Sequence, residues 1–388
     1  MPMPPLVELG PPLTPAELTR YSRHVLLPGV GDEGQRRLRA ARVLVVGAGG
    51  LGSPVLLYLA AAGVGTIGIV DFDTVDASNL QRQVVHSTSA VGVAKVESAA
   101  ATIANLNPDV LLEQHLIHLD ASNALDLVGR YDLVLDGCDN FPTRYLVNDA
   151  CVLAGKPLVW GSVLRFDGQV TVFWSAPPEG RPAIQYRDVF PRPPAPGTVP
   201  SCAQAGVLGA VCGAVGSAMA IEALKLIVGA GEPLLGRMAV FDALAATWRH
   251  VPIQPSPTTP VVTELVDLEA VCEIEMPLPT IGPRALAARL AARERGEDDL
   301  DLVDVREPAE HTLVAIPGSR LVPQGRFADD EAFDELPRDR DVVLYCRSGV
   351  RSADVLRLAR EHGMSRVSHL EGGVLAWADM VDPSLPRY

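Results

Sequence analysis

The 388-residue sequence predicts an α/β protein in which a doubly wound, mostly parallel sheet is followed by a small, separate α/β domain. Two observations lead to this prediction. Apolar strand-like runs alternate with helix-like segments from about residue 42, and the same alternation restarts after a proline-rich break at residues 251–260. Hydrophobic residues make up 48% and charged residues 21%, as in a globular chain long enough for two or three cores.

The expected elements of the larger domain follow in order along the chain. Strands are predicted at 42–47, 66–71, 109–114, 131–137 and 157–163, and helices at 53–63, 95–106 and 140–155. Eight prolines between Ala176 and Pro200 rule out regular structure there and suggest an extended loop. The alternation implies a doubly wound sheet, with a helix in the apolar segment that follows the proline-rich loop.

The smaller domain has its own set of elements. Helices are predicted at 283–296 and 351–363, and strands at 301–306 and 341–346. The boundaries that follow are a first domain at residues 1–252, a proline-rich linker at 253–279 and a second domain at 280–388. We expect the linker to act as a semi-extended spacer.

Charge and cysteine content exclude several function classes. The net charge of −14 argues against a nucleic-acid-binding surface, which needs clustered Lys and Arg. The six cysteines include no C-x-x-C pair, and no signal peptide is recognisable, so we expect reduced thiols in a cytoplasmic protein. The longest apolar run, 205–221, is shorter than a typical membrane span and favours a buried or subunit-interface helix, so no membrane association is expected.

A glycine-rich turn follows the first predicted strand. GAGGLG places Gly47, Gly49 and Gly52 between a strand and a helix, where backbone N–H groups can approach phosphate. Asp71 ends the next strand, at a position from which a carboxylate can bind a ribose hydroxyl. These features alone are most common in NAD-dependent dehydrogenases. The alternative to any nucleotide-binding role is a glycine-rich turn that binds no ligand.

The residues that follow favour a triphosphate over NAD. DFDTVDASNLQRQVVH contains Asp73 and Arg82, VGVAKVE contains Lys95, and LDGCDN places Asp139 and Asn140 after another strand. A triphosphate needs cations, here Arg82 and Lys95, and a carboxylate to hold magnesium, for which Asp139 is the candidate. A redox dinucleotide needs neither a metal nor this many charges.

Five motifs, RYSRH, GAGGLG, DFDTVDASNLQRQ, GVAKVES and DGCDN, occur in the order and spacing of the ubiquitin-activating-like family of MoeB, ThiF and HesA adenylyltransferases, which residues 17–250 resemble. The resemblance implies a Rossmann-like fold and transfer of AMP from ATP to the C-terminal Gly-Gly carboxylate of a ubiquitin-like protein. It implies a homodimer in which Arg23 reaches the phosphates from the other subunit; a solvated helix charge is the alternative. The residues implied to bind ATP and magnesium are Gly50, Asp71, Ser78, Asn79, Leu80, Gln81, Arg82, Lys95, Asp139 and Asn140.

The sequence departs from this family in one respect. Members typically hold a structural zinc through two C-x-x-C pairs, but the corresponding segments here, AIQYRDVFPRPP and HVPIQPSPTT, contain no cysteine. We therefore predict that this protein has no zinc site. Cys202 precedes a predicted helix, whose dipole can lower the pKa of a thiol. The family's cysteine at this place is proposed to form a thioester or a persulfide-linked intermediate, and a cysteine that only packs is the alternative.

The smaller domain contains YCRSGVRS, residues 345–352, in which Cys346 follows an apolar strand and a helix begins near Ser352. Such a loop can point backbone N–H groups inward around the sulfur, and Arg347 and Arg351 add charge that favours a thiolate or persulfide. Fewer residues separate Cys346 from Arg351 than in protein tyrosine phosphatases, whose longer loop encloses a phosphate. The loop therefore resembles that of rhodanese-type sulfurtransferases, which implies a persulfide cradle formed by Arg347, Ser348, Gly349, Val350 and Arg351.

Three further segments, DLVDVREPAEH, IPGS and EGGVLAW, carry the rhodanese resemblance over residues 280–380. Asp304 and Arg306, in the first of them, are expected to be structural supports. The resemblance implies that Cys346 carries sulfur as a persulfide, and an inert buried thiol is the alternative.

An adenylating domain joined to a rhodanese domain resembles the MoeZ-type adenylyltransferase/sulfurtransferases. The resemblance implies that the Cys346 persulfide attacks the acyl-adenylate of the carrier and that a thiocarboxylate is released, with Cys202 as a possible resolving thiol. The sulfur donor would be a cysteine desulfurase or thiosulfate, and the product would serve molybdenum cofactor, thiamin, cysteine or tRNA-thiolation chemistry. Alternatives are an activating enzyme that forms a thioester through Cys202 for protein conjugation, with a separate role for the rhodanese domain, and a non-catalytic scaffold, which the presence of Arg23, Arg82, Lys95 and Asp139 disfavours.

Overall fold

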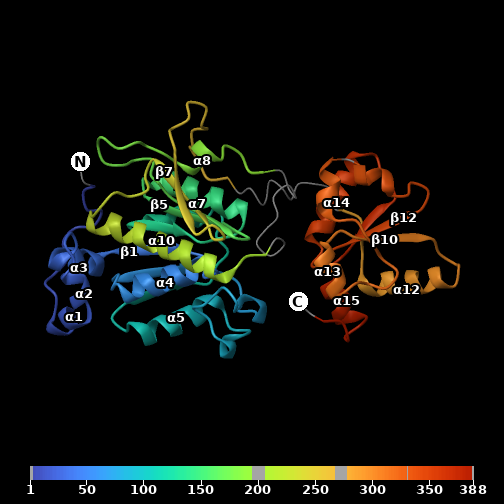
Figure 1. Cartoon of the computed structure of the whole chain (residues 1–388), viewed down its shortest axis with the longest axis horizontal. Coiled ribbons are helices and arrows are strands. Elements are labelled where there is room, and N and C mark those ends of the chain that lie inside the picture. Colours follow the sequence, from blue (N-terminus) through green and yellow to red (C-terminus); the bar gives the residue numbers. More distant parts are fainter. Residues whose placement is uncertain (1–2, 195–205, 267–277, 330, 387–388) are drawn as a thin grey trace. The chain divides into compact units, whose positions relative to one another are not determined.

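The computed structural model describes residues 3–194, 206–266, 278–329 and 331–386. The described chain forms two compact units (Figure 1), the first within residues 3–266 and the second from residue 278 onward. Each unit has its own sheet. The two units are described separately below.

The sheet of the first unit has the strand order β3-β2-β1-β4-β5-β6-β7-β8. Its strands are β1 (Arg42–Val46), β2 (Thr66–Val70), β3 (Leu111–His115), β4 (Leu133–Asp136), β5 (Leu158–Leu164), β6 (Asp167–Phe173), β7 (Arg237–Asp242) and β8 (Thr247–Pro252). The first five are parallel to their neighbours, and β6, β7 and β8 extend the sheet in antiparallel fashion. The predicted mostly parallel, doubly wound sheet is therefore confirmed.

Helices cover both faces of this sheet, because side chains alternate along each buried strand. Val43 and Val45 of β1 pack in one core with α3, α4, α5 and α10, whereas Leu44 and Val46 pack in a second core with α6 and α7. The helices are α1 (Pro15–Arg20), α2 (Ser22–Val25), α3 (Gly31–Ala40), α4 (Gly52–Ala61), α5 (Lys95–Leu106), α6 (Ala124–Gly129), α7 (Phe141–Ala154), α8 (Tyr186–Val189) and α10 (Gly209–Val228), with short 3₁₀ turns η1 (Ala77–Asn79) and η2 (Thr88–Ala90).

The long apolar helix α10 is a core helix. Among the described residues it alone is long and apolar enough to cross a membrane, but 56% of its apolar window is buried inside the unit. It packs against α3, α4, β5 and β6, and it lies beside α4 in Figure 1. A Cβ on Gly216 would lie 2.4 Å from Cγ of Pro54, so the close crossing of α10 and α4 depends on that glycine. Of the two predicted possibilities, a buried or a subunit-interface helix, the structure supports burial within the unit.

The prediction that residues 176–200 contain no regular structure is wrong for one turn. Tyr186–Val189 form the short helix α8, which lies between Pro182 and Pro191 in a stretch without proline. A capping box closes the turn, in which the backbone N–H of Gln185 donates to Asp188 Oδ2 at 2.7 Å. A proline-free stretch of a few residues is thus long enough for one capped turn.

The second unit is a five-stranded parallel sheet with the order β11-β10-β12-β13-β9. Its strands are β9 (Thr280–Ile281), β10 (Leu300–Asp304), β11 (Arg320–Leu321), β12 (Asp341–Tyr345) and β13 (Val367–Leu370), and its helices are α12 (Pro283–Glu294), α13 (Pro308–Leu313), α14 (Val350–Glu361) and α15 (Gly373–Met380), with the 3₁₀ segments η3 (Gln324–Asp329) and η4 (Glu331–Glu335). Cys346 follows the central strand β12, and α14 begins at Val350, within two residues of the predicted start.

Candidate active sites

A cavity lies where the strand order of the first sheet reverses. β1 is flanked by β2 on one side and by β4 on the other, so the loops leaving β1 and β4 diverge and open a crevice at the carboxyl ends of the strands. The empty volume there is about 910 Å³, part of it open to solvent. Nine residues predicted to bind nucleotide line it: Gly47, Gly49, Gly50, Asp71, Asp73, Arg82, Lys95, Asp139 and Asn140.

The glycine turn has the close approaches that the sequence predicted. Gly47 has a φ of 89°, in the region that favours glycine. Gly52 does not line the cavity. Its role is to make the turn possible, because a Cβ at this position would lie 1.8 Å from the carbonyl oxygen of Gly47. α4 begins at Gly52, which places the start of a helix beside the cavity.

Asp71 holds this turn as well as lining the cavity. Its Oδ2 accepts a hydrogen bond from the backbone N–H of Ala48 at 2.9 Å, and its Oδ1 accepts one from the N–H of Asp73 at 2.9 Å. Burial raises the pKa of Asp71, opposed by the nearby Lys95 ammonium. His86 contacts the Ala48 carbonyl oxygen at 2.9 Å through Nε2, so the turn is tied to two separate segments.

The two predicted cations are held differently. Lys95 is the first residue of α5 and is buried, and its Nζ lies 2.7 Å from Oδ2 of Asp73. The Arg82 guanidinium donates to the carbonyl of Ser78 at 3.1 Å and remains on the cavity wall. A phosphate in the cavity would therefore meet both a paired ammonium and a guanidinium that donates to a carbonyl.

The DGCDN segment separates a buried carboxylate from an exposed one. Asp136 is fully buried; its Oδ1 accepts from the N–H of Cys138 at 3.0 Å, and its Oδ2 has no hydrogen-bond partner among the described residues. Burial raises the pKa of Asp136. Asp139 is exposed, whereas Asn140 caps α7 by accepting from the Thr143 N–H at 2.9 Å. Of these two carboxylates, Asp139 is therefore the one that a ligand in the cavity can reach.

Several predicted residues lie outside the cavity lining. Ser78, Asn79, Leu80 and Gln81 lie on and just after η1, and they do not line the cavity, unlike their neighbour Arg82. Arg23 is exposed on α2 and does not line the cavity of its own chain. Cys202 falls outside the described residues.

The lining also contains residues that sequence reasoning did not identify: Phe72, Ile117, His118, Leu119, Cys138, Thr143, Arg144, Val163, Val207 and Cys212. The rings of Phe72 and His118 lie 4.9 Å apart and come from the segments after β2 and β3. Arg144 is buried on α7 and donates to the Cys138 carbonyl at 2.9 Å, which fixes the loop that carries Asp139. Phe72 follows Asp71 directly, so its place at a strand end was a usable signal; His118 follows a strand without a motif.

In the second unit, the sulfur of Cys346 lies inside a closed loop. Cys346 is 1% exposed, and its Sγ accepts from the backbone N–H of Gly349 at 3.1 Å. Gly349 has a φ of 97°, which turns this N–H into the loop. The EGG segment packs directly against the loop, because a Cβ on Gly373 would lie 2.4 Å from the Cys346 carbonyl oxygen, which accepts from the Val374 N–H at 2.8 Å.

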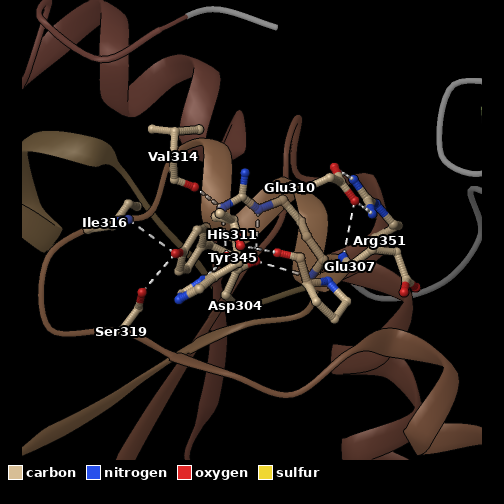
Figure 2. A network of polar contacts seen from close by, with 12 residues as sticks. Asp304, Glu307, Glu310, His311, Val314, Ile316, Ser319, Tyr345 and Arg351 are labelled. Atoms are coloured by element: carbon tan, nitrogen blue, oxygen red, sulfur yellow. Dashed lines mark hydrogen bonds and ion pairs between the residues drawn. The ribbon is translucent and has the colours of Figure 1, made fainter.

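Arg351 does not contribute an unbalanced positive charge to the loop, as the sequence suggested. It is buried and paired with Glu310 of α13 through two contacts of 2.6 and 2.7 Å (Figure 2). Burial alone would raise the pKa of Glu310, but the hydrogen bonds from Arg351 and the Glu307 N–H, together with the charges of Arg351 and Arg306, lower it on balance. Of the other predicted cradle residues, Arg347 is half-buried, and Ser348 and Val350 are exposed.

Asp304 and Arg306 form the fully buried ion pair that supports this unit. The Arg306 guanidinium contacts both oxygens of Asp304, at 2.8 and 2.6 Å, and also donates to the Val314 carbonyl at 2.6 Å. His311 Nδ1 lies 2.8 Å from Asp304 Oδ2. The Tyr345 hydroxyl accepts from the Ile316 N–H, and Figure 2 shows Tyr345 within the same network. The residue before Cys346 is thereby fixed.

Comparison with known proteins assigns both units. The ThiF family matches residues 21–261, and the rhodanese-like domain matches residues 287–380. The probable adenylyltransferase/sulfurtransferase MoeZ of Mycobacterium tuberculosis is 51% identical over 100% of this chain and 99% of its own length. The adenylyltransferase and sulfurtransferase MOCS3 of Drosophila yakuba is 39% identical over 97% of this chain and 86% of its own length.

Further relatives match the first unit alone. The sulfur carrier protein adenylyltransferase of Thermus thermophilus is 52% identical over 67% of this chain and 98% of its own length. The crystal structure of E. coli MccB with MccA-N7isoASN shares the fold, with a TM-score of 0.55 and 22% identity over 63% of this chain and 74% of that one. The chain thus belongs to the ThiF family, as a member with a C-terminal rhodanese-like domain, and is an adenylyltransferase and sulfurtransferase.

Proposed function

We propose that this enzyme adenylates the C-terminal Gly-Gly carboxylate of a small ubiquitin-like sulfur carrier protein and then converts it to a thiocarboxylate with sulfur carried on Cys346. The observation that carries the proposal is the convergence of Arg82, Lys95 and Asp139 on the cavity beside the glycine turn. These residues come from three separate motifs, and together they supply two cations and one carboxylate. Membership of the ThiF family implies that the nucleotide is ATP.

The cavity residues suit attack of a carboxylate on the α-phosphate. That attack builds negative charge on phosphate oxygens, which Arg82 and Lys95 can stabilise because they are fixed before the substrate arrives. Asp139, exposed in the cavity, is the proposed ligand of the magnesium that accompanies ATP, and hard carboxylate oxygens are what this ion prefers. When bound, magnesium would neutralise phosphate charge.

The second unit suits storage of a sulfur atom. The N–H of Gly349 already contacts Sγ of Cys346 and is placed to stabilise an anionic sulfur there. A persulfide formed on Cys346 from a desulfurase or thiosulfate would attack the acyl-adenylate carbonyl and displace AMP. Cys202 is the proposed thiol that then attacks the Cys346 sulfur of the acyl disulfide and releases the thiocarboxylate.

We also propose that the enzyme acts as a cytoplasmic homodimer in which Arg23 of the partner subunit completes the nucleotide site. Arg23 is exposed on α2 and does not line the cavity of its own subunit. An arginine that approaches the phosphates from a second subunit would add positive charge where the reaction builds negative charge. Arg23→Ala should then lower adenylation without changing stability.

We propose that hydrogen bonds replace the zinc of related proteins. The two segments without cysteines meet at Asp188, whose Oδ1 accepts from the Ser256 N–H at 2.9 Å and from the Thr259 hydroxyl at 2.5 Å. Among the described residues there is no group of three His, Cys, Asp or Glu side chains that could hold a metal ion. The Asp188 contacts supply the cross-link that a metal would otherwise provide.

ATP–pyrophosphate exchange with candidate carriers tests the adenylation step. We expect exchange with a carrier that ends in Gly-Gly and none with the same carrier lacking these two residues. Exchange should also be lost in Arg82→Ala and Asp139→Ala. Exchange that persists in both variants, or that is indifferent to the Gly-Gly end, would refute the assignment.

A further inference from the structure

The Ser352 hydroxyl lies close to three polar groups, one of which is the sulfur of Cys346. It lies in the first turn of α14 and is fully buried. Its hydroxyl lies 3.6 Å from Sγ of Cys346, 3.0 Å from the Gly349 carbonyl oxygen and 3.3 Å from Nδ1 of His369. A hydroxyl has one proton, so it can donate to only one of these groups at a time. Which group it serves decides whether the sulfur is a hydrogen-bond donor or an acceptor.

His369 reaches Ser352 from the neighbouring strand. It lies on β13 and pairs in register with Leu344 of β12, two residues before Cys346. Its side chain is 8% exposed, and burial, together with Arg357 of α14, lowers its pKa. The Gly349 backbone and Glu371 act in the opposite direction.

The residues that pair with His369 in register on the two neighbouring strands carry no charge. Arg357 is itself paired with Asp354 at 2.8 Å, and the strand partners of His369, Leu344 and Thr280, are uncharged. The imidazole is therefore neutral near pH 7 and can accept a proton.

We propose that Ser352 and His369 are positioning residues that relay the thiol proton of Cys346 when its sulfur becomes anionic. In the resting state the thiol S–H donates to Ser352 Oγ, and the serine O–H donates to His369 Nδ1. On ionisation the S–H bond breaks and its proton passes to Oγ, while the former hydroxyl proton passes to Nδ1. The new serine O–H then donates to the sulfur anion. No oxidant, reductant or further reactant is needed.

The relay explains how a loop whose Arg351 is already paired with a carboxylate can hold an anion. Arg351 is paired with Glu310, so backbone and hydroxyl donors have to provide much of the stabilisation of the sulfur. The N–H of Gly349 is fixed, whereas the Ser352 hydroxyl becomes available only after its proton exchange with His369. The role in sulfur transfer rests on the proposed function of Cys346, but the effect on the thiol itself does not.

Alkylation of Cys346 in the full-length protein tests the relay without any sulfur donor. The rate of modification by iodoacetamide would be followed for the Cys346 peptide by mass spectrometry across a pH series. We expect Ser352→Ala and His369→Asn to move the rise in rate to higher pH and to lower the rate at neutral pH by about tenfold, because hydrogen bonds to a charged group contribute on the order of one pKa unit. Ser352→Thr, which keeps the hydroxyl, should restore the profile.

A matched control is available in the same unit. His362 follows the far end of α14, stacks on Phe333 at 4.2 Å and contacts the Leu358 carbonyl, so His362→Asn should leave the profile unchanged. Because His369 acts through Ser352, the double variant Ser352→Ala/His369→Asn should be no slower than Ser352→Ala alone.

Two outcomes would overturn the relay. One is a wild-type pH profile in His369→Asn. The other is an equal loss of rate at every pH with a lower melting temperature, which would indicate packing alone. The proposed function fails separately: thiosulfate-dependent cyanolysis that survives Cys346→Ala would refute sulfur carriage by Cys346, whatever the alkylation profile shows.

Discussion

The nucleotide cavity of the first unit and the Cys346 loop of the second unit differ in whether their charged side chains are paired within the protein. In the first unit, Asp139 is exposed, and Arg82 lines open volume with a carbonyl as its hydrogen-bond partner. In the second unit, Cys346 is 1% exposed, and the neighbouring Arg351 and Arg306 are each paired with a carboxylate through two contacts. In the first site Arg82 and Asp139 can still meet a charged ligand, whereas in the second site the charges of Arg351 and Arg306 are already balanced by carboxylates.

This difference suits what we propose each site holds. ATP enters and leaves with several negative charges, so its site needs cations and a metal-binding carboxylate that face an opening. A persulfide sulfur is covalently attached and needs only a few aligned donors. Burying Arg351 without a partner would cost a large desolvation free energy, and its ion pair with Glu310 offsets that cost.

The largest expected effect is the separation of the two activities by point substitution. Cys346→Ala should abolish thiosulfate cyanolysis and leave ATP–pyrophosphate exchange unchanged, because it removes the nucleophile of the second unit only. Arg82→Ala should do the reverse, lowering exchange by roughly 10²- to 10³-fold through lost charge stabilisation. Both activities would be measured on the same preparations. If either substitution suppresses both activities, the two sites are not chemically independent.

The second largest effect is expected on the free energy of unfolding of the second unit. Arg306→Ala leaves Asp304 buried without its main partner and should destabilise this unit by about 3–5 kcal/mol. Arg320→Ala, which removes an ion pair with Asp301 at the surface, is the matched control and should cost at most about 1 kcal/mol. Denaturant unfolding of the two variants measures the contrast; equal losses would show that burial does not decide the strength of these pairs.

The third prediction concerns the pH dependence of the Glu310–Arg351 pair. Because the folded-state pKa of Glu310 is lowered, its stabilisation is complete above the unfolded value, about 4.5, and is lost as the pH falls through the lower folded value. Glu310→Gln should therefore be less stable than wild type by about 1–3 kcal/mol at pH 7, with the two converging in acid. Glu335→Gln, at the exposed pair with Arg326, should show little difference at either pH. A gap that widens in acid would contradict the lowered pKa.

The smallest effect is expected at the Asp188 junction, which we propose takes the place of a zinc site. Asp188→Asn weakens contacts to Gln185, Ser256 and Thr259 and should cost about 1–2 kcal/mol in the first unit. Ser256→Ala keeps the backbone N–H that Asp188 binds and should be nearly neutral. A chelator should not change the melting temperature of the wild type, and stoichiometric zinc by elemental analysis would show that hydrogen bonds are not the cross-link.

Periodic elements of the fold were predictable from the sequence, whereas short or exposed ones were not. The helix at 95–106 was predicted with the bounds that α5 has, because apolar residues recur along one helical face. The short helices α1 and α2 have no buried residue, and every residue of β8 is exposed, so none of them carries an alternating or helical apolar pattern. These elements had to be seen in the structure.

The same distinction holds for the sites. Gly47, Arg82 and Lys95 lie in local motifs, and the fold brings them together as those motifs predict. The pairing of Arg351 with Glu310 joins residues 41 positions apart, and nothing in YCRSGVRS indicates it. Contacts of His369 with Ser352 likewise depend on which strands are neighbours. Local motifs therefore predict which residue types are present, and only the tertiary structure shows which of their charges are balanced.

The most direct test of the central claim is intact mass spectrometry of Gly-Gly-terminated candidate carriers after incubation with the enzyme, ATP, magnesium and thiosulfate. We predict that one carrier gains the mass difference between sulfur and oxygen, that the gain requires ATP, and that it is absent with Cys346→Ala. A carrier that is adenylated but never gains sulfur, with a competent sulfur donor present, would contradict the account. The first unit would then activate its substrate for another purpose, and the second would transfer sulfur independently.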